Sequence, residues 1–248
     1  MKYELETIPI WDTYELDSEC PLCILEERAE ERYVDFFLGN SVMVPEMRVE
    51  VNKTGFCPKH NHRLFVSEKN RHGLGLVSHT HIKTFLADID KSQKKLAKSA
   101  ASLPASKLRK LVTSSYVDRL KNWENRCMIC DRLEYTINRY AFTIVYLWNK
   151  REDFAKKYEQ SKGFCIHHLP CVFKTAADLL HGKRYTGFVA KTLELQHQSF
   201  ARIEGELHWY TQKFDYQNDD KPWGTARDAL NRAIQKITGR IMHDRAGR

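Results

Sequence analysis

Residues 20–60 begin with Cys20-Pro21-Leu22-Cys23 and end with Gly55-Phe56-Cys57-Pro58-Lys59-His60. Residues 127–168 begin with the letters CMIC and end with GFCIHH. Both stretches therefore place a CxxC pair before a GFCxxH pair, and the spacers between the two pairs are 33 and 34 residues long. This agreement in order, residue type and spacing predicts that one helical unit occurs twice in the chain.

The two motifs supply the donor atoms that a tetrahedral metal site needs. A CxxC pair can turn both sulfurs toward one ion across a tight turn, and CxxH does the same at the first turn of a helix. Three thiolates and one imidazole suit zinc and leave no position open for a substrate. We therefore predict two structural zinc ions per chain, one within each copy. The predicted ligands are Cys20, Cys23, Cys57 and His60 in the first copy and Cys127, Cys130, Cys165 and His168 in the second.

Other donors near the motifs leave alternatives open. His62 and His167 have no counterpart in the other copy, which favours His60 and His168 as the ligands. Cys171 also lacks a counterpart and is interpreted as a buried thiol. The same donor set could instead hold an iron–sulfur cluster in a redox or sensor protein. Visible absorption separates the two cases, because zinc is colourless.

Apolar residues recur at helical spacing along most of the chain, and no window shows sustained strand alternation. Long apolar seams run from Ile82 to Leu103 and from Val189 to Phe214. We predict an all-α fold, with a duplicated helical unit, long antiparallel helices in a bundle-like arrangement and two metal-pinned helix junctions. The expected segments are a first metal-binding repeat at 1–103, a second repeat with a linker helix at 104–217 and a C-terminal capping helix at 218–248, all within one globule.

The composition is that of a globular protein, with 42% hydrophobic and 29% charged residues. The N-terminal residues contain no apolar signal region, and the longest apolar run, Ala141 to Trp148, is too short to span a bilayer. We therefore expect a cytoplasmic protein without membrane contact. Thiols stay reduced in the cytoplasm, which favours metal binding over disulfides.

The formal net charge of +8 raises the question of a polyanionic partner. Two sites of three thiolates each would lower it to about +6. The basic clusters at 91–98, 107–110 and 150–162 fall on different predicted helices, and acids interrupt the basic residues around Glu152. We expect no sequence-specific nucleic-acid binding, since a dedicated reader places its basic residues on one face.

The motifs and the C-terminal stretch together resemble a known family. The stretch from Glu206 to Tyr216 reads ELHWYTQKFDY and is followed by Pro222-Trp223-Gly224. With CPLC, GFCPKH, CMIC and GFCIHH, it resembles an uncharacterised family of bacterial cytoplasmic proteins over nearly the whole chain. Some members are labelled as ABC-transporter substrate-binding proteins, a label that fits poorly with the missing export signal. The resemblance implies no activity and supports only the motif boundaries.

The same C-terminal stretch combines aromatic and acidic side chains. Such a combination can form a pocket for a small molecule or a cation, although a packed helix seam is the simpler interpretation. The candidate pocket residues are Trp209, Tyr210, Phe214, Asp215, Tyr216 and Trp223. No nucleophile motif and no phosphate loop is present. The leading hypothesis is a non-catalytic binding or interaction protein with a protein or small-molecule partner, and an enzyme with its site in this stretch is an alternative.

Overall fold

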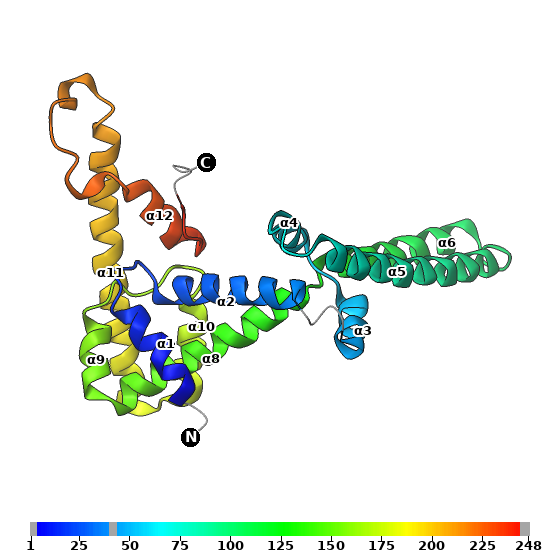
Figure 1. The fold of residues 1–248 in the computed structure, drawn as a ribbon, viewed down its shortest axis with the longest axis horizontal. Helices are drawn as coiled ribbons and strands as arrows, with labels where there is room; N and C mark the ends of the chain where they lie inside the picture. The colour runs from blue at the N-terminus through cyan, green and yellow to red at the C-terminus, as the bar shows by residue number, and fades with distance from the viewer. Residues whose placement is uncertain (1–3, 40–43, 244–248) are drawn as a thin grey trace. The chain divides into compact units, whose positions relative to one another are not determined.

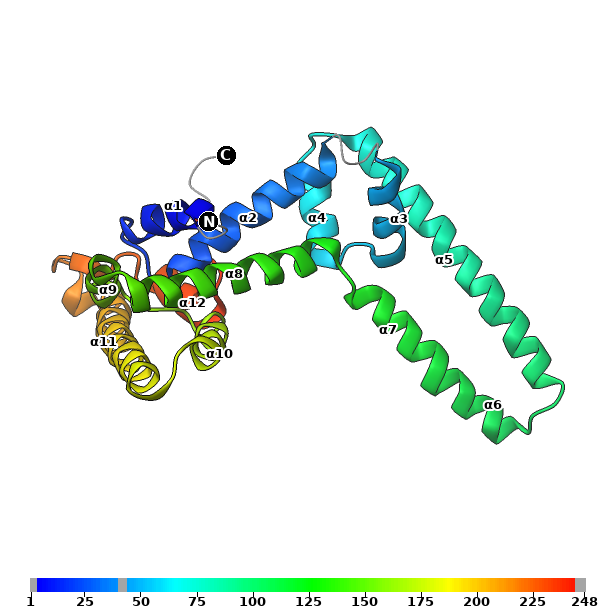
Figure 2. The same cartoon turned by 90° about the horizontal axis from the view of Figure 1, so that it is seen from below.

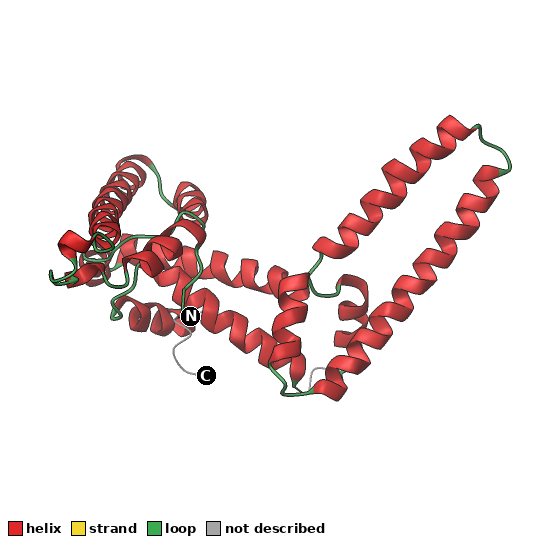
Figure 3. Cartoon of the chain, turned by 90° about the horizontal axis from the view of Figure 1, so that it is seen from above, coloured by secondary structure: helices red, strands yellow, loops and turns green. Residues whose placement is uncertain are grey.

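The computed structural model describes residues 4–39 and 44–243, and every regular element among them is helical (Figure 1, Figure 3). The predicted all-α fold is confirmed. A π-helical segment, Val112–Val117, joins α6 to α7, and 3-10 turns occupy Tyr216–Asn218 and Gly224–Ala226. The α-helices are α1 (Glu4–Tyr14), α2 (Pro21–Leu38), α3 (Pro45–Thr54), α4 (Pro58–Val66), α5 (Arg71–Ala100), α6 (Ala105–Leu111), α7 (Asp118–Asn125), α8 (Met128–Lys150), α9 (Glu152–Glu159), α10 (Leu169–Leu179), α11 (Gly182–Gln212) and α12 (Ala229–Thr238).

Packing divides the chain into two compact units that are not consecutive in sequence. The first unit comprises residues 1–29 and 135–248, and the second comprises residues 30–134. Helix α2 begins in the first unit and ends in the second, whereas α8 begins in the second and ends in the first. The expected segments 1–103, 104–217 and 218–248 stay a prediction, and residues 1–3, 40–43 and 244–248 lie outside the described part of the chain.

The first unit has an aromatic and aliphatic core. Phe154, Tyr158, Phe164 and Phe188 are almost completely buried, and the Tyr158 and Phe188 ring centroids lie 5.4 Å apart. Fully burying one such side chain contributes about 2–3 kcal/mol. The start of α2 belongs to this core through Leu22 and its neighbouring cysteines, so the first CxxC lies within the hydrophobic core of this unit.

The second unit contains a helical hairpin, in which α5 runs out and α6 and α7 return antiparallel to it (Figure 2). Helices α3 and α4 pack against α5. The buried side chains of this unit include Val51 on α3, Leu64 on α4 and Val77 near the start of α5. Among the side chains described between residues 78 and 126, none is buried.

Two glycines turn the chain into the second half of each motif. Gly55 and Gly163 have φ angles of 72° and 71°, which side chains disfavour. A Cβ at Gly55 would also lie 2.6 Å from Cε1 of His81. Pro58 then begins α4, where its missing N–H costs nothing. In the second motif the helix starts later, at Leu169, so the expectation that Cys165 opens a helix is wrong.

The chain enters the C-terminal helix through a 3-10 turn. Thr225 lies in the 3-10 turn Gly224–Ala226, and Asp228 precedes α12 without a side-chain cap. Asp228 instead accepts hydrogen bonds from Arg232. In the described part of the chain, no helix combines the length and apolar character needed to cross a membrane.

Candidate metal centres

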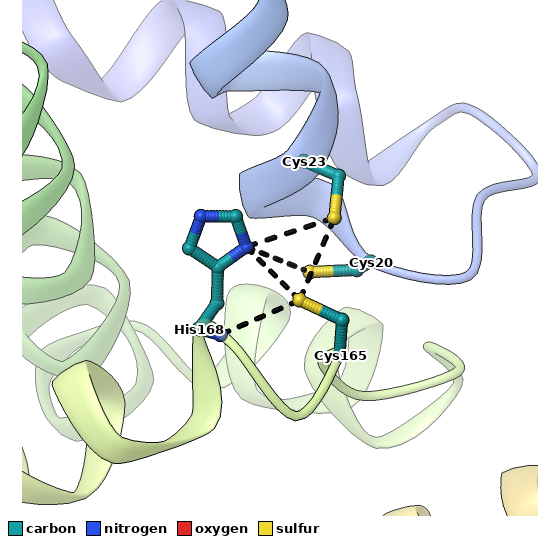
Figure 4. Close-up of side chains that lie close together, drawn as sticks. All are labelled: Cys20, Cys23, Cys165 and His168. Carbon is teal, nitrogen blue, oxygen red and sulfur yellow. Dashed lines mark hydrogen bonds between the residues drawn. The ribbon is translucent and has the colours of Figure 1, made fainter. Parts of the chain in front are cut away.

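The first candidate centre consists of Cys20, Cys23, Cys165 and His168, all buried in the first unit (Figure 4). The Nδ1 atom of His168 lies 3.6 Å from the sulfurs of Cys20 and Cys23 and 3.1 Å from that of Cys165. The sulfurs of Cys23 and Cys165 are 3.6 Å apart. Cys23 lies in the first turn of α2, Cys20 directly precedes that helix, and Cys165 and His168 lie in the loop before α10.

The second candidate centre consists of Cys57, His60, Cys127 and Cys130 in the second unit. The Nδ1 atom of His60 lies 3.3 Å from the sulfurs of Cys57 and Cys130 and 3.1 Å from that of Cys127. The sulfurs of Cys57 and Cys130 are 3.8 Å apart. Cys130 is exposed and Cys57 is half-buried, so solvent reaches this centre more easily than the first.

The expected pairing of ligands within each copy is wrong. Each centre joins the CxxC of one motif to the CxxH of the other, although the eight side chains are those that the spacing predicted. Cys57 lies in the second compact unit together with His60, Cys127 and Cys130, whereas Cys20 lies in the first.

The spacing of the donor atoms fits a single tetrahedral ion. Zn–S bonds of about 2.3 Å and Zn–N bonds of about 2.0–2.1 Å give tetrahedron edges of about 3.8 Å between sulfurs and about 3.6 Å between sulfur and nitrogen. The sulfur–sulfur distances of 3.6 and 3.8 Å agree with this geometry. The sulfur–nitrogen distances of 3.1–3.6 Å are equal or slightly shorter.

The cysteines of each centre shift one another's pKa in the metal-free protein. Cys23 and Cys130 lie in the first turns of α2 and α8. Hydrogen bonds with Cys165 and Cys20 raise the pKa of Cys23, and burial and the charge of Cys127 raise that of Cys130. The Cys130 amide also donates to the sulfur of Cys127, and the His168 amide donates to that of Cys165. Hydrogen bonds from Cys20 and Cys23 hold the pKa of Cys165 far below its usual range. These contacts prepare the sulfurs for a cation.

Two glutamates on α2 lie beside the histidines, although neither belongs to a CxxC or CxxH motif. Nε2 of His60 lies 2.7 Å from a carboxylate oxygen of Glu30, and Nε2 of His168 lies 3.3 Å from one of Glu26, without an aligned hydrogen bond. A proton on Nε2 leaves the Nδ1 lone pair free for a metal, which is a common arrangement at zinc sites. Their positions three and seven residues after Cys23 were the only signal in the sequence.

Hydrogen bonds at the second centre determine the protonation of its histidine, of one thiol and of Glu30. Burial alone lowers the pKa of His60, but hydrogen bonds with Cys127 and Glu30 raise it to about 9. Burial raises the pKa of Cys127, but the hydrogen bond with His60 brings it down to about 6. Lys59 lies 2.8 Å from Glu30, and Arg63 also donates to this carboxylate. Glu30 therefore remains charged while it holds His60 in place.

A buried lysine lies beside the first centre. Lys236 on α12 is completely buried, and its Nζ atom donates to the carbonyl oxygens of Lys162 and Phe164, at 2.5 and 3.3 Å. Burial lowers its pKa, while the charges of Glu19 and Cys20 oppose that shift. A centre of three thiolates and a neutral histidine carries one negative charge with Zn²⁺, so this cation offsets it. No feature of the sequence distinguished Lys236.

The alternative donors lie away from the sulfurs. His62 is exposed on α4, and the ring of His167 packs against that of His168 with centroids 4.9 Å apart. Cys171 is half-buried and lies 3.1 Å from the side-chain oxygen of Asn138. The geometry thus groups only one histidine with each set of three cysteines.

A lysine lies beside the aromatic residues that were expected to form a C-terminal pocket. The rings of Tyr210, Phe214 and Trp223 contact one another, and the ammonium of Lys213 lies 5.3 Å from the Trp223 ring. Lys213 donates to three backbone carbonyls of the following loop. Phe214 and Tyr216 are 73% and 85% exposed. Ligand binding by this stretch, including Trp209 and Asp215, stays a prediction.

Comparison with known proteins gives a family but no activity. A family model, described as a family of unknown function (DUF6062), matches residues 1–244. No curated protein and no solved structure matches the chain. The expected resemblance to an uncharacterised family is therefore confirmed, and any function has to be argued from the two centres and their surroundings.

Proposed function

The chain belongs to DUF6062, a family of unknown function, and we propose that it is a non-catalytic interaction protein folded around two structural zinc ions. The observation that carries this proposal is the convergence of three sulfurs and one Nδ1 atom in each unit, at the spacing of a zinc tetrahedron. Eight cysteine and histidine side chains gather in this way without any shared disulfide.

A structural role follows from the ligand number. Four protein ligands fill the tetrahedral shell of zinc, whereas catalytic zinc keeps one position for water or substrate. The first centre is also closed from outside, because Cys20, Cys23, Cys165 and His168 are all buried. Its ion would stabilise the packing of α2 against the loop before α10 instead of acting on a substrate.

Each ion would fasten parts of the chain that are far apart in sequence. The first centre joins Cys23 to Cys165, and the second joins His60 to Cys127. Cys57 and His60 lie at the start of α4, the helix before α5, and Cys127 and Cys130 lie at the start of α8, the helix after α7. This ion would therefore hold the segments at the two ends of the hairpin together. Metal-binding free energy then appears as folding stability.

Zinc is favoured over an iron–sulfur cluster by the compactness of both groups. The ligands of a cluster bind different irons and are spread around it. Here the donor atoms of each centre all lie within 4.8 Å of one another. This spacing leaves room for one ion at the middle and not for a cluster with bridging sulfides.

Elemental analysis of the purified full-length chain tests the proposal directly. We expect two equivalents of zinc, no labile sulfide and no visible absorption. A melting experiment with and without a strong chelator should show a large loss of thermal stability on zinc removal. Iron with sulfide, or fewer than one zinc per chain, would show that the proposed function is wrong. Zinc removal without loss of stability would show that the centres are not structural.

A further inference from the structure

The hairpin formed by residues 71–125 exposes apolar side chains along its outer part. Ile82, Leu86 and Leu96 on α5 are 57%, 54% and 39% exposed. With Ile89 they fall on one face at spacings of four, three and seven residues. Two antiparallel helices leave such a stripe uncovered, because an amphipathic helix ordinarily buries its apolar face against a further layer.

A groove of about 400 Å³ runs beside this stripe, between α5 and the returning helices. Its floor is mainly apolar, and the π-helical segment Val112–Val117 forms part of its wall. Arg119 marks one end, where it donates to Ser92 at 2.9 Å and pairs with Asp88 at 3.3 Å. The apolar lining residues are Ile89, Leu96, Leu111, Val112 and Tyr116.

The groove lies in the most basic part of the chain. Residues 91–110 contain seven lysines and arginines and no aspartate or glutamate. The basic clusters at 91–98 and 107–110 do fall on different helices, as expected from the sequence. The structure nevertheless makes α5 and α6 antiparallel neighbours, so both clusters belong to the same end of one hairpin (Figure 2).

We propose that this groove docks an acidic amphipathic helix of a partner protein. Apolar side chains at every third or fourth position of that helix would enter the groove, and its carboxylates would meet the flanking lysines. The inference rests on the proposed role as an interaction protein and specifies the chemistry of its partner.

Charge and shape favour this occupant over the others. A second copy of the hairpin would bring like charges together at 91–110, which opposes self-association through this surface. A nucleic-acid backbone matches the lysines but gains nothing from an apolar floor, since single-strand and duplex binders use aromatic platforms or base contacts. A lipid surface matches the charge but calls for an apolar face that projects outward, whereas Ile89, Leu111 and Val112 are half-buried between the helices.

A designed pair of peptides tests the proposal on the full-length, zinc-loaded chain. The first is a fluorescein-labelled helix with leucine at the groove-facing positions and glutamate elsewhere, and the second has lysine in place of every glutamate. We expect the acidic peptide to bind at physiological salt and the basic peptide not to bind. Zinc content is measured on the same sample, so failure of peptide binding with two zinc ions bound overturns this inference alone.

Two double variants separate the apolar and electrostatic parts of the surface. Leu86→Ser with Leu96→Ser removes exposed apolar groups, and Lys94→Glu with Lys95→Glu reverses local charge. Each should weaken binding of the acidic peptide about tenfold or more. The matched controls in the first unit are Leu193→Ser with Ile237→Ser, both sites being more than half exposed, and Lys183→Glu with Arg184→Glu. The controls should change binding less than twofold, and circular dichroism checks that all four remain helical.

Three outcomes would overturn the proposal. Equal binding of both peptides would show that charge does not select the partner. Insensitivity to the groove variants would place the peptide elsewhere. Tighter binding of duplex DNA or of anionic phospholipid vesicles than of the acidic peptide, lost in the lysine variant but unchanged in the leucine variant, would identify the hairpin as a polyanion-binding surface.

Discussion

The sulfurs of Cys23 and Cys165 lie 3.6 Å apart, although 142 positions separate these residues in the chain. Cys23 belongs to the first CxxC and Cys165 to the second GFCxxH. Their contact establishes that the two motifs exchange halves, so each centre depends on both motifs. Loss of Cys23 should therefore affect the centre that Cys165 and His168 of the second motif complete.

Paired variants should reveal the exchanged ligands through zinc content. Cys23→Ser with Cys165→Ser removes two ligands of the first centre, so one zinc per chain should remain. Cys23→Ser with Cys57→Ser removes one ligand from each centre, and both ions should be lost or bound weakly. Elemental analysis after gel filtration measures the difference. The reverse result, one zinc in the second variant and none in the first, would restore pairing within each copy.

The sequence carried enough information for the helices and for the eight candidate ligands. Helical periodicity and the prolines at Pro21 and Pro58 marked where helices run and begin, because these are local properties of the chain. The CxxC and CxxH spacings likewise reflect local geometry, since each pair must turn toward one point within a single turn. Such local patterns can be interpreted without knowledge of the tertiary structure.

Pairing between the motifs is not a local property and could not be predicted. With spacers of 33 and 34 residues, either CxxC could share an ion with either CxxH, as disulfide connectivity is also undetermined by spacing. The decision depends on α2 and α8, which each pass from one unit to the other. Long-range contacts such as those of Glu30 with His60 and Lys236 with Phe164 were hidden for the same reason.

The two centres should lose zinc to a chelator at different rates. Cys130 is exposed and Cys57 is half-buried, whereas all four residues of the first centre are buried. A chelator can approach the second centre without local unfolding, so zinc release should show a fast phase and a slow phase of equal size. Stopped-flow mixing with a chromogenic chelator resolves them. Cys127→Ser should remove only the fast phase, and a single phase in the unmodified protein would contradict the difference in access.

Glu30→Gln should weaken zinc binding at the second centre by about 10–100-fold, as is typical when a carboxylate that orients a ligating histidine is lost. The glutamine keeps an oxygen near Nε2 of His60 but lacks the charge that also pairs with Lys59. Competition with a calibrated chelator measures the affinity. Glu31→Gln, at an exposed neighbouring position, is the matched control and should have no effect. Equal affinities in both variants would show that Glu30 does not support the centre.

Zinc affinity at the second centre should rise with pH up to about 9. The pKa of His60 in the metal-free protein is raised to about 9, so at neutral pH this histidine must release a proton before it binds the ion. A raised histidine pKa stabilises the metal-free fold fully below its unfolded value of about 6.5, and this contribution disappears as the pH rises through 9. Raising the pH thus weakens the competing proton-bound state.

Chelator competition across this pH interval measures the effect on Cys23→Ser with Cys165→Ser, which retains only the second centre. His60 releases one proton on binding, and so does Cys130, whose pKa is raised by burial and by the charge of Cys127. Each released proton corresponds to up to about tenfold per pH unit. The pKa of Cys127, lowered to about 6, adds little because this thiol is already charged at neutral pH. An affinity that stays constant from neutral pH to pH 9 would show that neither His60 nor Cys130 holds a proton in the metal-free protein.

Loss of the second zinc should loosen the hairpin while leaving the first unit intact. His60 and Cys127 are 67 positions apart, and a cross-link closing such a loop contributes about 4 kcal/mol by the chain-entropy relation. No described side chain between residues 78 and 126 is buried, so this part of the hairpin has no core of its own. Trp123 packs against His81 and Phe85, with centroids 4.8 and 4.9 Å apart.

Hydrogen exchange of the Cys127→Ser variant, followed by mass spectrometry, tests this coupling. Amides of α5 and α7 should exchange about tenfold faster or more, whereas those of α11 in the first unit should not change. Cys171→Ser is the matched control, because it removes a thiol that lies outside both centres. Unchanged exchange in α5 and α7 after measured loss of one zinc would mean that protein contacts such as those of Trp123 hold the base of the hairpin without the ion. The second centre would then have no role in presenting the groove.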